Sequence, residues 1–591
     1  MDPKKTILKI LHAFIAPDES LIEIPPDDAL GDYAYPCFML AKELKKSPVK
    51  IAEEFAKKLT PEAPFKKIEA AGPYINFFFD PAALACLTLA KIHDEKEEYG
   101  KEPSLKEKTI MVEYPSPNTN KPLHLGHVRN IVLGSSVARI LKFQGHTVIQ
   151  ANLNNDRGIH ICKSMLAYQK WGGNAQPNIK SDHFVGKFYV DYCQREKEHP
   201  ELEQEAQEML RKWEAGDKHT RELWKLMSAW AYSGFEDTYE KLGVNFDKYY
   251  YESDFYDKGK EIVLENVFDG VEKGIFKKDE TGAIYADLQK QGLGKKILLR
   301  PDGTSIYITQ DLYLAKLKFD DQKLDQSIYV VAHEQDHHFK VLFSLLGLLK
   351  YPAEKCHHLS YGMVNLPSGR MKSREGTVVD ADDIIANMHD LAAVEIRKRF
   401  SDLSDDEIND RAKKIGIAAL KFFLAKIDPA KDMLFDPNES ISFEGETGPY
   451  VQYAHARIYS IIKKFMEQNE PLFDALRKNT PHHDRDSLLD SFFEANHVKS
   501  SMLTQGQEKK IVKLLYQFPD IIFESAEKLK PNLVANYLIA LAQAFNEFYH
   551  ACPILMAEKD QRNARLFLAH CVRHVLKTGL ALLGIEAPEE M

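Results

Sequence analysis

Residues 109–149 read TIMVEYPSPNTNKPLHLGHVRNIVLGSSVARILKFQGHTVI, and this stretch decides the fold class. Its first residues, 109–112, form an apolar run of the length of a buried strand, and a loop rich in proline and asparagine follows. Residues 128–143 carry apolar side chains at helical spacing, and Gly145 is a typical helix terminator. Residues 147–149 are strand-like again. This order predicts one unit of an α/β doubly wound parallel sheet, which binds ligands at the loop after its first strand.

The sheet domain is expected to continue well beyond this unit. Residues from about 160 to 290 are rich in lysine and glutamate, and we predict that they form a helical insertion. Three β-rich segments are predicted as later strands of the same sheet, at 303–309, 327–332 and 358–364. The segment after 327–332 has helical spacing over 339–349.

The two ends of the chain differ from the sheet domain. The N-terminal part combines a charged helical pattern at 50–59 with an aromatic strand at 74–79, which Asp80-Pro81 ends, and charge-rich residues 94–108 resemble a linker. Beyond Asp382, a plausible N-cap, almost only helical periodicity remains, in six segments: 383–400, 405–427, 449–468, 485–528, 532–550 and 561–583. We therefore predict three domains: an N-terminal α/β module (1–105), a Rossmann-type domain with the insertion (106–385) and an all-helical domain (386–591).

The composition excludes several classes of protein. The chain has 591 residues, of which 44% are hydrophobic and 28% charged, as is usual for a soluble globular protein. No apolar stretch is long enough for a membrane helix and no secretory signal is visible, so we expect no membrane association and a cytoplasmic location. Seven scattered cysteines without a CxxC pair indicate reduced core residues rather than disulfides or a zinc site. The net charge of −10 means that any nucleic-acid binding must depend on local basic patches.

The most informative motif is His124-Leu125-Gly126-His127, between the first strand and the helix. Backbone N–H groups at a helix N-terminus attract anions, so His124 and His127 suit phosphate binding there, and Gly126 lets a nucleotide approach the backbone. The alternative is two solvated loop histidines. Neither a GxxxxGK[ST] motif nor a GxGxxG motif after a strand occurs, so the usual phosphate loops are missing.

A second motif lies at 369–376, where Arg370, Lys372 and Arg374 stand between two glycines. Such a basic loop could close over a polyphosphate, and its alternative is a solvated charged turn. Its position on the same predicted sheet domain as the two histidines favours the first interpretation.

These residues resemble a known family, the class I arginyl-tRNA synthetases. Residues 117–127 resemble the HIGH signature in its arginyl form, and 369–376 resemble the KMSKS loop. Residues 306–311, 333–339 and 448–457 are similar to further blocks of the family, in the family's order. The resemblance implies a monomer that joins arginine to tRNA(Arg) with ATP, releasing AMP and pyrophosphate. By the same resemblance Mg²⁺ accompanies ATP, although the sequence shows no dedicated carboxylate cage for a metal.

Recognition of a guanidinium calls for carboxylates, because two parallel hydrogen bonds separate arginine from lysine. Glu113 ends the first predicted strand and Asp311 follows the predicted strand 303–309, so both are expected at carboxyl ends of the sheet. The resemblance implies an arginine pocket of five residues: Glu113, Asn118, Tyr307, Asp311 and Gln335.

Two positions depart from the family pattern. The KMSKS loop usually offers a lysine where this chain has Ser373, and Arg370 replaces the first lysine, so Lys121 is the natural substitute for the catalytic cation. Arg157 stands where a tryptophan is common in the family, and it receives no role. The catalytic residues implied are His124, His127 and Lys121. The ATP contacts implied are Gly126, His124, His127, Met363, Val364, Arg370, Lys372 and Ser373.

The resemblance also implies RNA contacts at both ends of the chain. Helical anticodon domains read unstacked bases with aromatic and polar side chains, so Tyr450 and Arg457 are candidates, although tyrosines at helical spacing are often core residues. In the N-terminal module, Asn76 is the candidate for contact with the corner of the tRNA.

Three rival functions fit the sequence less well. His333-Glu334-Gln335-Asp336-His337 satisfies HExxH, the zinc-metalloprotease pattern, but a strand-like run precedes it and the motif straddles a strand end and a helix start. A non-catalytic tRNA-binding module would leave the ATP-type loops unused. A synthetase for cysteine would need thiolate zinc ligands, which the cysteine spacing does not supply.

Overall fold

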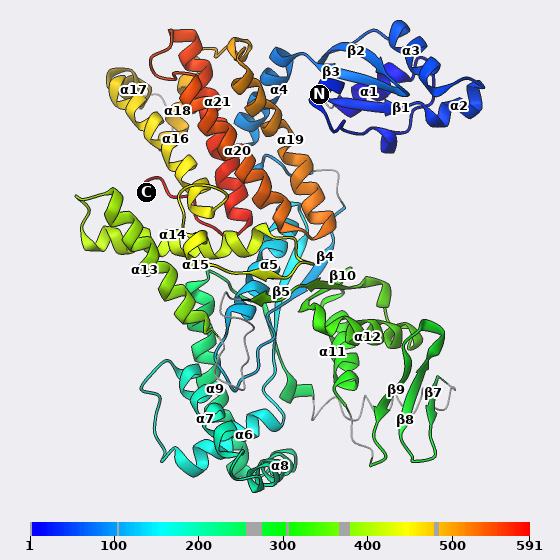
Figure 1. Cartoon of the computed structure of the whole chain (residues 1–591), viewed down its shortest axis with the longest axis vertical. Helices are drawn as coiled ribbons and strands as arrows, with labels where there is room; N and C mark the ends of the chain where they lie inside the picture. The colour runs from blue at the N-terminus through cyan, green and yellow to red at the C-terminus, as the bar shows by residue number, and fades with distance from the viewer. Residues whose placement is uncertain (1–2, 103–105, 256–274, 303–305, 366–378, 478–483) are drawn as a thin grey trace.

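Figure 1 shows the computed structural model, which describes residues 3–102, 106–255, 275–302, 306–365, 379–477 and 484–591. A parallel sheet lies at the centre, with the C-terminal helices above it and the N-terminal module at the upper right of the view. One apolar core runs through the N-terminal module, the central sheet and the C-terminal helices. The predicted α/β class is confirmed.

The N-terminal module is a three-stranded antiparallel sheet with helices packed on it. Its strands are β1 (Tyr33–Pro36), β2 (Phe65–Ala71) and β3 (Tyr74–Phe79), in the order β1-β3-β2. β3 is the predicted aromatic strand, and it takes the middle position because it pairs on both edges. The helices are α1 (Pro3–Leu11), α2 (Phe38–Leu44) and α3 (Pro48–Lys58).

The helix α4 (Pro81–Glu95) connects this module to the rest of the chain, and the sequence prediction missed it. Its start is well defined, because the Asp80 carboxylate accepts hydrogen bonds from the backbone N–H groups of Ala82 (2.8 Å) and Ala83 (3.1 Å). Pro81 at the first helical position suits a helix as well as it ends a strand. The charge-rich linker predicted from residue 94 therefore begins inside the last turn of α4.

The central sheet has five parallel strands in the order β11-β10-β4-β5-β6. They are β4 (Thr109–Glu113), β5 (Thr147–Asn154), β6 (Lys248–Tyr251), β10 (Gln326–Ala332) and β11 (Cys356–Tyr361). The chain fills one side of β4 with β5 and β6, and later fills the other side with β10 and β11. A parallel sheet that reverses its order in this way opens a ligand crevice at the carboxyl ends of the two strands where the reversal occurs, here β4 and β10.

Residues 303–305 of the predicted strand 303–309 lie outside the described residues, and over 306–309 the prediction is wrong. Residues from Tyr307 on belong to the helix α11 (Tyr307–Gln322). Its residues Ile308, Leu312 and Ala315 are buried in one apolar cluster, and this i, i+4, i+7 spacing outweighs the β-branched character of the segment. Asp311 therefore lies in the second turn of a helix rather than after a strand.

The helical insertion is shorter than predicted. Four helices follow β5: α6 (Ile159–Trp171), α7 (Ser181–Arg195), α8 (Glu201–Glu214) and α9 (Lys218–Lys241). The helical prediction is wrong at 248–251, where β6 joins the central sheet, and residues 256–274 lie outside the described residues. Three further strands then form an antiparallel sheet: β7 (Phe276–Lys278), β8 (Ile284–Leu288) and β9 (Gly294–Leu299). In β8 the buried residues Ile284, Ala286 and Leu288 alternate with less buried ones, a strand period hidden within a lysine-rich segment.

The remaining elements complete the sheet domain and the C-terminal part. α5 (Leu125–Phe143) joins β4 to β5, α12 (Asp336–Leu348) follows the short 3-10 turn η5 (His333–Gln335), and β12 (Val364–Asn365) pairs with β13 (Met433–Leu434). The C-terminal helices are α13 (Ala381–Arg399), α14 (Asp405–Lys426), α15 (Pro437–Ser440), α16 (Gly448–Gln468), α17 (Glu470–Arg477), α18 (Arg485–Ala495), α19 (Gly506–Lys528), α20 (Pro531–Ala551) and α21 (Lys559–Leu582).

Three details of the predictions need correction. The segment 485–528 is two helices, α18 and α19, rather than one. The N-cap of α13 is Asp380, whose carboxylate accepts from the Asp382 N–H at 2.8 Å, so Asp382 is not the cap. All seven cysteines are free, as predicted, but Cys86 is exposed rather than part of the core. No helix within the described ranges is long and apolar enough to cross a bilayer.

Candidate functional site

Residues 124–127, which we term the HLGH turn, lie at the start of α5 and contain the two histidines. His124 is the N-cap and has extended backbone angles, and its backbone N–H donates to His127 Nδ1 at 3.1 Å. Because His127 Nδ1 accepts this bond, the proton of the neutral ring resides on Nε2. The two rings lie 3.8 Å apart between centroids, so they form a single unit. A Cβ on Gly126 would lie 3.0 Å from the His124 ring, which explains why glycine separates them.

Both imidazoles are neutral near pH 7. Burial lowers the pKa of His124 to about 4, and Lys121 adds to the shift. Burial, His124 and Lys121 together hold the pKa of His127 well below its usual value. Each neutral ring keeps one N–H, so the turn offers hydrogen-bond donors to a phosphate without adding charge of its own. The N-terminus of α5 adds backbone N–H groups, which point out of the helix end and can also bind an anion.

A second segment pairs with the HLGH turn along its backbone. Leu125 N–H donates to Val379 C=O at 3.1 Å, and Ala381 N–H donates to Leu123 C=O at 2.9 Å. His124 and Asp380 face one another in this short antiparallel ladder. The described residue that follows the basic loop 369–376 most closely, Val379, is thus bonded to the turn. The predicted loop residues Arg370, Lys372 and Ser373 themselves lie outside the described residues.

Lys121 lies just before the HLGH turn, next to the insertion. The helix α7 meets this segment at Gly186, where an added Cβ would lie 2.6 Å from Pro122 Cδ and 3.4 Å from Lys121 Cα. Lys121 is half-buried, and its charge acts on both imidazoles, as their pKa shifts show. The structure therefore brings the three predicted catalytic residues together, with a positive charge beside two neutral donors.

Glu113 ends β4 at the crevice, as predicted, but it is buried against an internal cation. Its Oε2 lies 2.5 Å from Lys318 Nζ of α11, and both side chains are almost wholly buried. Lys318 also lies 4.2 Å from the ring centroid of Tyr329 on β10. The charge of Glu113 is thus largely balanced within the protein, a feature that the sequence did not reveal.

The other predicted arginine-pocket residues lie on α11, in η5 and in the loop after β4. Asp311 on α11 pairs with His338 on α12, with 2.7 Å between Asp311 Oδ2 and His338 Nε2. Tyr307, at the start of α11, is 70% exposed, and Gln335 is exposed in η5 at the end of β10. Asn118 is exposed and forms a parallel bridge with Asn155 beyond the end of β5.

A cavity of about 510 Å³ opens beside Tyr307 and is lined by a half-buried acid that the sequence analysis did not identify. This acid is Glu252, whose pKa burial raises to about 7 against the opposing effect of Arg157. In the amide orientation that satisfies both neighbours, Gln310 donates to Glu252 Oε1 and accepts from Arg157 Nη1, each at 2.9 Å. Glu252 follows β6 directly, so it was hidden because β6 was predicted as helix; its place at a strand's carboxyl end was the available signal.

The predicted nucleotide contacts Met363 and Val364 follow β11 and are held by Arg129 of α5. Arg129 donates to four backbone carbonyls: Gly362 (2.6 Å), Met363 (3.1 Å), Pro429 (3.3 Å) and Lys431 (2.8 Å). The Met363 N–H in turn donates to Asp432 Oδ1 at 2.6 Å. A buried guanidinium that satisfies four carbonyls fixes this stretch beside the start of α5.

The predicted RNA contacts have partners of their own. Asn546 on α20 links two of them, since its Nδ2 donates to Tyr450 Oη at 2.8 Å and its Oδ1 accepts from Arg457 Nη1 at 2.7 Å. Arg457 also lies over the rings of Tyr453 and Tyr549. Asn76 is only 3% exposed, so β3 presents little of this side chain to a ligand.

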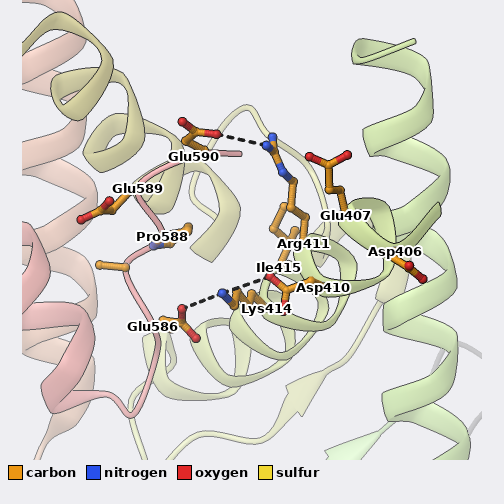
Figure 2. A pocket seen from close by; sticks show the side chains of 11 residues that line it. Asp406, Glu407, Asp410, Arg411, Lys414, Ile415, Glu586, Pro588, Glu589 and Glu590 are labelled. Carbon is orange, nitrogen blue, oxygen red and sulfur yellow. Dashed lines mark hydrogen bonds and ion pairs between the residues drawn. The ribbon is translucent and has the colours of Figure 1, made fainter. Parts of the chain in front are cut away.

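Two features do not fit a cofactor or substrate site. Among the described residues, one group of side chains has the spacing of metal ligands, Asp182, His183 and Asp382, but Lys180 and Lys241 already pair with Asp382. This group therefore does not suit Mg²⁺, and we assign no protein ligand to that ion. A second cavity of about 580 Å³ lies between α14 and residues 586–590 (Figure 2). Its lining is mainly acidic, with Arg411 and Lys414 paired to Glu590 and Glu586, and it contains no predicted site residue.

Comparison with known proteins gives the family. Residues 88–436 match the family model of the class I tRNA synthetase (R) catalytic domain, residues 451–591 match the DALR anticodon binding domain, and residues 3–79 match the arginyl tRNA synthetase N-terminal domain. The chain belongs to the class I arginyl-tRNA synthetases. It is thus an enzyme of the aminoacyl-tRNA ligase class.

Individual relatives of this synthetase family agree. An arginine–tRNA ligase of Treponema denticola is 45% identical over 98% of this chain and 96% of the relative. One of Parabacteroides distasonis is 42% identical over 94% of this chain and 92% of the relative. The arginyl-tRNA synthetase structure of Thermus thermophilus superimposes with a TM-score of 0.80 at 27% identity, covering 100% of this chain and 99% of that one.

The metalloprotease alternative has no support. His333 lies in η5 and His337 in α12, so the HExxH motif straddles a turn and a helix start, as the sequence indicated. His333 lies 3.6 Å from Asp432, and His337 belongs to no group with metal-ligand spacing in the described ranges.

Proposed function

We propose that this chain activates arginine with ATP to arginyl-adenylate and then transfers the arginyl group to the 3′ end of tRNA(Arg). In the first step the arginine carboxylate attacks the α-phosphorus of ATP and pyrophosphate leaves. In the second step a terminal ribose hydroxyl attacks the arginyl carbonyl and AMP leaves. The observation that carries this proposal is the HLGH turn at the crevice beside β4 and β10, at the N-terminus of α5.

The protein's role in the first step is to position reactants and to stabilise charge on the phosphates. His127 donates its Nε2–H, as its tautomer requires, and His124 and the α5 N-terminus add donors. Lys121 supplies the positive charge that a lysine of the KMSKS loop would provide in other members. The backbone near Met363 and Val364 contacts the base, held in place by Arg129. ATP enters with Mg²⁺, whose positive charge reduces repulsion between the phosphates.

Arginine specificity depends chiefly on Asp311. Its carboxylate is about one-third exposed, whereas Glu113 is buried and paired with Lys318. Asp311 can therefore form the two parallel hydrogen bonds that a guanidinium offers. Tyr307, Gln335 and Asn118 complete the predicted pocket around the bound amino acid.

The three domains divide the recognition of the tRNA. We assign residues 1–105 to the tRNA corner, 106–385 to catalysis and 386–591 to the anticodon, with Tyr450 and Arg457 as candidate contacts in α16. Lys and Arg on these surfaces would bind phosphates despite the net charge of −10. We further propose a cytoplasmic monomer, in keeping with the resemblance.

The proposal is tested by pyrophosphate–ATP exchange with each amino acid in turn, with and without total tRNA. We expect exchange with arginine alone among the amino acids, and only when tRNA is present. Exchange with another amino acid would retain the enzyme class and refute the assigned pocket. Absence of exchange under all conditions would refute the proposed activity.

A further inference from the structure

The helix α7 of the insertion contacts both strands of the short ladder that holds the HLGH turn. His183 and Gly186 are three residues apart and so lie on one face of α7. Gly186 packs closely against Pro122, which precedes the turn. His183 Nε2 lies 3.3 Å from Asp380 Oδ1 and 3.4 Å from Asp382 Oδ2, on the segment that pairs with the turn.

The same segment is held by further groups of the insertion. Lys180, the N-cap residue of α7, lies with its Nζ 2.8 Å from Asp382 Oδ2, and Lys241 of α9 lies 2.5 Å from Asp382 Oδ1. Thr238 of α9 donates to Asp382 at 3.1 Å. The insertion thus directs three cationic or donor groups, besides His183, at the start of α13.

The charges at this junction balance one another. Lys180 also pairs with the buried Asp182 at 3.0 Å. Asp380 and Asp382 raise the pKa of His183 to about 10 against burial, so the ring is protonated at neutral pH. The pKa of Asp382 is low, because its hydrogen bonds to His183, Lys180 and Lys241 outweigh burial. Ammonium and imidazolium groups therefore occupy the places that a metal ion would need.

We propose that His183 is a positioning residue: by pairing with Asp380 and Asp382, it fixes the segment 379–382 against the insertion and thereby sets where His124 meets ATP. Asp380 transmits this position because its backbone lies opposite His124 in the ladder. The inference rests on the proposed function of the HLGH turn. This proposal gives the helical insertion a defined part in ATP binding, although its helices lie outside the central sheet.

The experiment measures pyrophosphate–ATP exchange with arginine and tRNA for the full-length wild type and His183→Ala. We expect kcat to fall about tenfold or more and the KM for ATP to rise, since small misplacements in an active site have large effects on rate. The KM for arginine should change less than about twofold, because Asp311 lies on a different element. Gln194→Ala, an exposed neutral position of α7, is the matched control and should behave as wild type.

Three further outcomes decide the inference. His183→Lys, which restores a cation, should recover much of the activity, whereas His183→Gln should not. His183→Ala combined with Asp380→Asn should lose no more than His183→Ala alone, because Asp380→Asn breaks a pair that His183→Ala has already removed. Wild-type kinetics in His183→Ala, equal effects on both substrates, additive losses or rescue by glutamine would each overturn the proposal. An inactive wild type would instead refute the proposed function.

If His183→Ala fails to fold, shown by loss of its cooperative thermal transition, Gly186→Ala probes the other contact of the same helix face. Its Cβ would press on Pro122, so we expect the same rise in the KM for ATP with the arginine KM unchanged. An unchanged KM for ATP in a folded Gly186→Ala protein would overturn the inference.

Discussion

At the scale of single residues, one hydrogen bond determines which nitrogen of His127 could donate to a phosphate in the proposed mechanism. The His124 N–H occupies His127 Nδ1 and leaves Nε2–H as the only donor of that ring. We predict that His127→Ala lowers kcat for exchange by about 10²- to 10³-fold, the usual effect of removing a donor from a developing charge. His219→Ala, an exposed histidine of α9, is the control.

The pH dependence of the reaction follows from the same turn. The pKa of His124 is lowered to about 4, so the ring becomes charged only as the pH falls well below 6.5. We expect kcat to show no acid limb near pH 6.5 from this residue. The lowered pKa also makes stability depend on pH. As the pH falls from 6.5 towards 4, His124 is protonated in the unfolded chain but not in the fold, so the free energy of unfolding decreases. A His124→Gln variant with a flatter stability profile across this range would confirm the shift; an identical profile would contradict it.

Asp311 carries a separate prediction about substrate choice. Asp311→Ala should weaken arginine use by about 1.5–3 kcal/mol, the scale for a charged hydrogen bond, with little change in the KM for ATP. Steady-state exchange kinetics with varied arginine and varied ATP measure both. Equal losses for the two substrates would remove Asp311 from the arginine pocket. His338→Ala distinguishes pairing from substrate binding, since it removes the partner of Asp311 and leaves the carboxylate in place.

Lys121 and the basic loop compete for one role. If Lys121 supplies the charge that Ser373 cannot, Lys121→Ala should reduce kcat at least about tenfold more than Lys372→Ala does, because Lys121→Ala removes a cation that acts on both imidazoles. Single-turnover adenylate formation separates this effect from product release. The reverse order of the two variants would place the catalytic cation in the loop.

At the scale of elements, the sequence predicted those helices and strands in which buried apolar residues recur at a regular helical or strand spacing. The strands predicted at 109–112, 147–149 and 327–332 are confirmed, since they lie within β4, β5 and β10, and so are most of the C-terminal helices. Over its described part, the strand predicted at 303–309 failed because the β-branched residues Ile308 and Thr309 are buried in the helix α11. β6 and β7–β9 were missed because their lysine content resembles that of the neighbouring helices. Missing β6 also concealed Glu252, and the Glu113–Lys318 pair joins residues 205 positions apart, which no local pattern reveals.

The helix α5 carries a prediction about packing. A Cβ on Gly134 would lie 2.5 Å from the ring of Tyr114, which is wholly buried. We expect Gly134→Ala to destabilise the fold by about 1–3 kcal/mol through overpacking, despite the better helix propensity of alanine. Thermal melting measures it. Gly506→Ala is the control, because a Cβ added at Gly506 meets no neighbouring atom within 4 Å. A Gly134→Ala protein as stable as this control would contradict the packing argument.

At the scale of the whole molecule, a buried lysine joins two distant parts of the chain. Lys421 of α14 donates to Gly584 C=O at 2.6 Å, and burial lowers its pKa from 10.5 to about 7. Between these two values the unfolded chain binds more protons than the native one, so stability from this group rises with pH, by at most about 1.4 kcal/mol per pH unit.

The stability of Lys421→Met should therefore rise less between pH 7 and 10 than that of wild type, because the contribution of Lys421 is missing. Denaturant titrations at several pH values measure the two slopes, and Lys413→Met on the exposed side of α14 serves as control. Parallel slopes in wild type and Lys421→Met would show that Lys421 stays charged in the fold.

The helix α5 also fixes a length. It starts at the HLGH turn, and along its 19 residues it contacts α13, α14, α19, α20 and α21. Inserting or deleting one residue within α5 would rotate the two histidines by about 100° and shift them by about 1.5 Å relative to those helices. Such a change would break contacts at one end of the helix, because the Leu125 N–H is bonded to Val379 C=O at the start and Gln144, which follows the helix, donates to Gly100 C=O at 2.9 Å. The chain can thus vary in length at exposed turns such as that between β8 and β9, whereas the spacing from His127 to Phe143 is set by geometry.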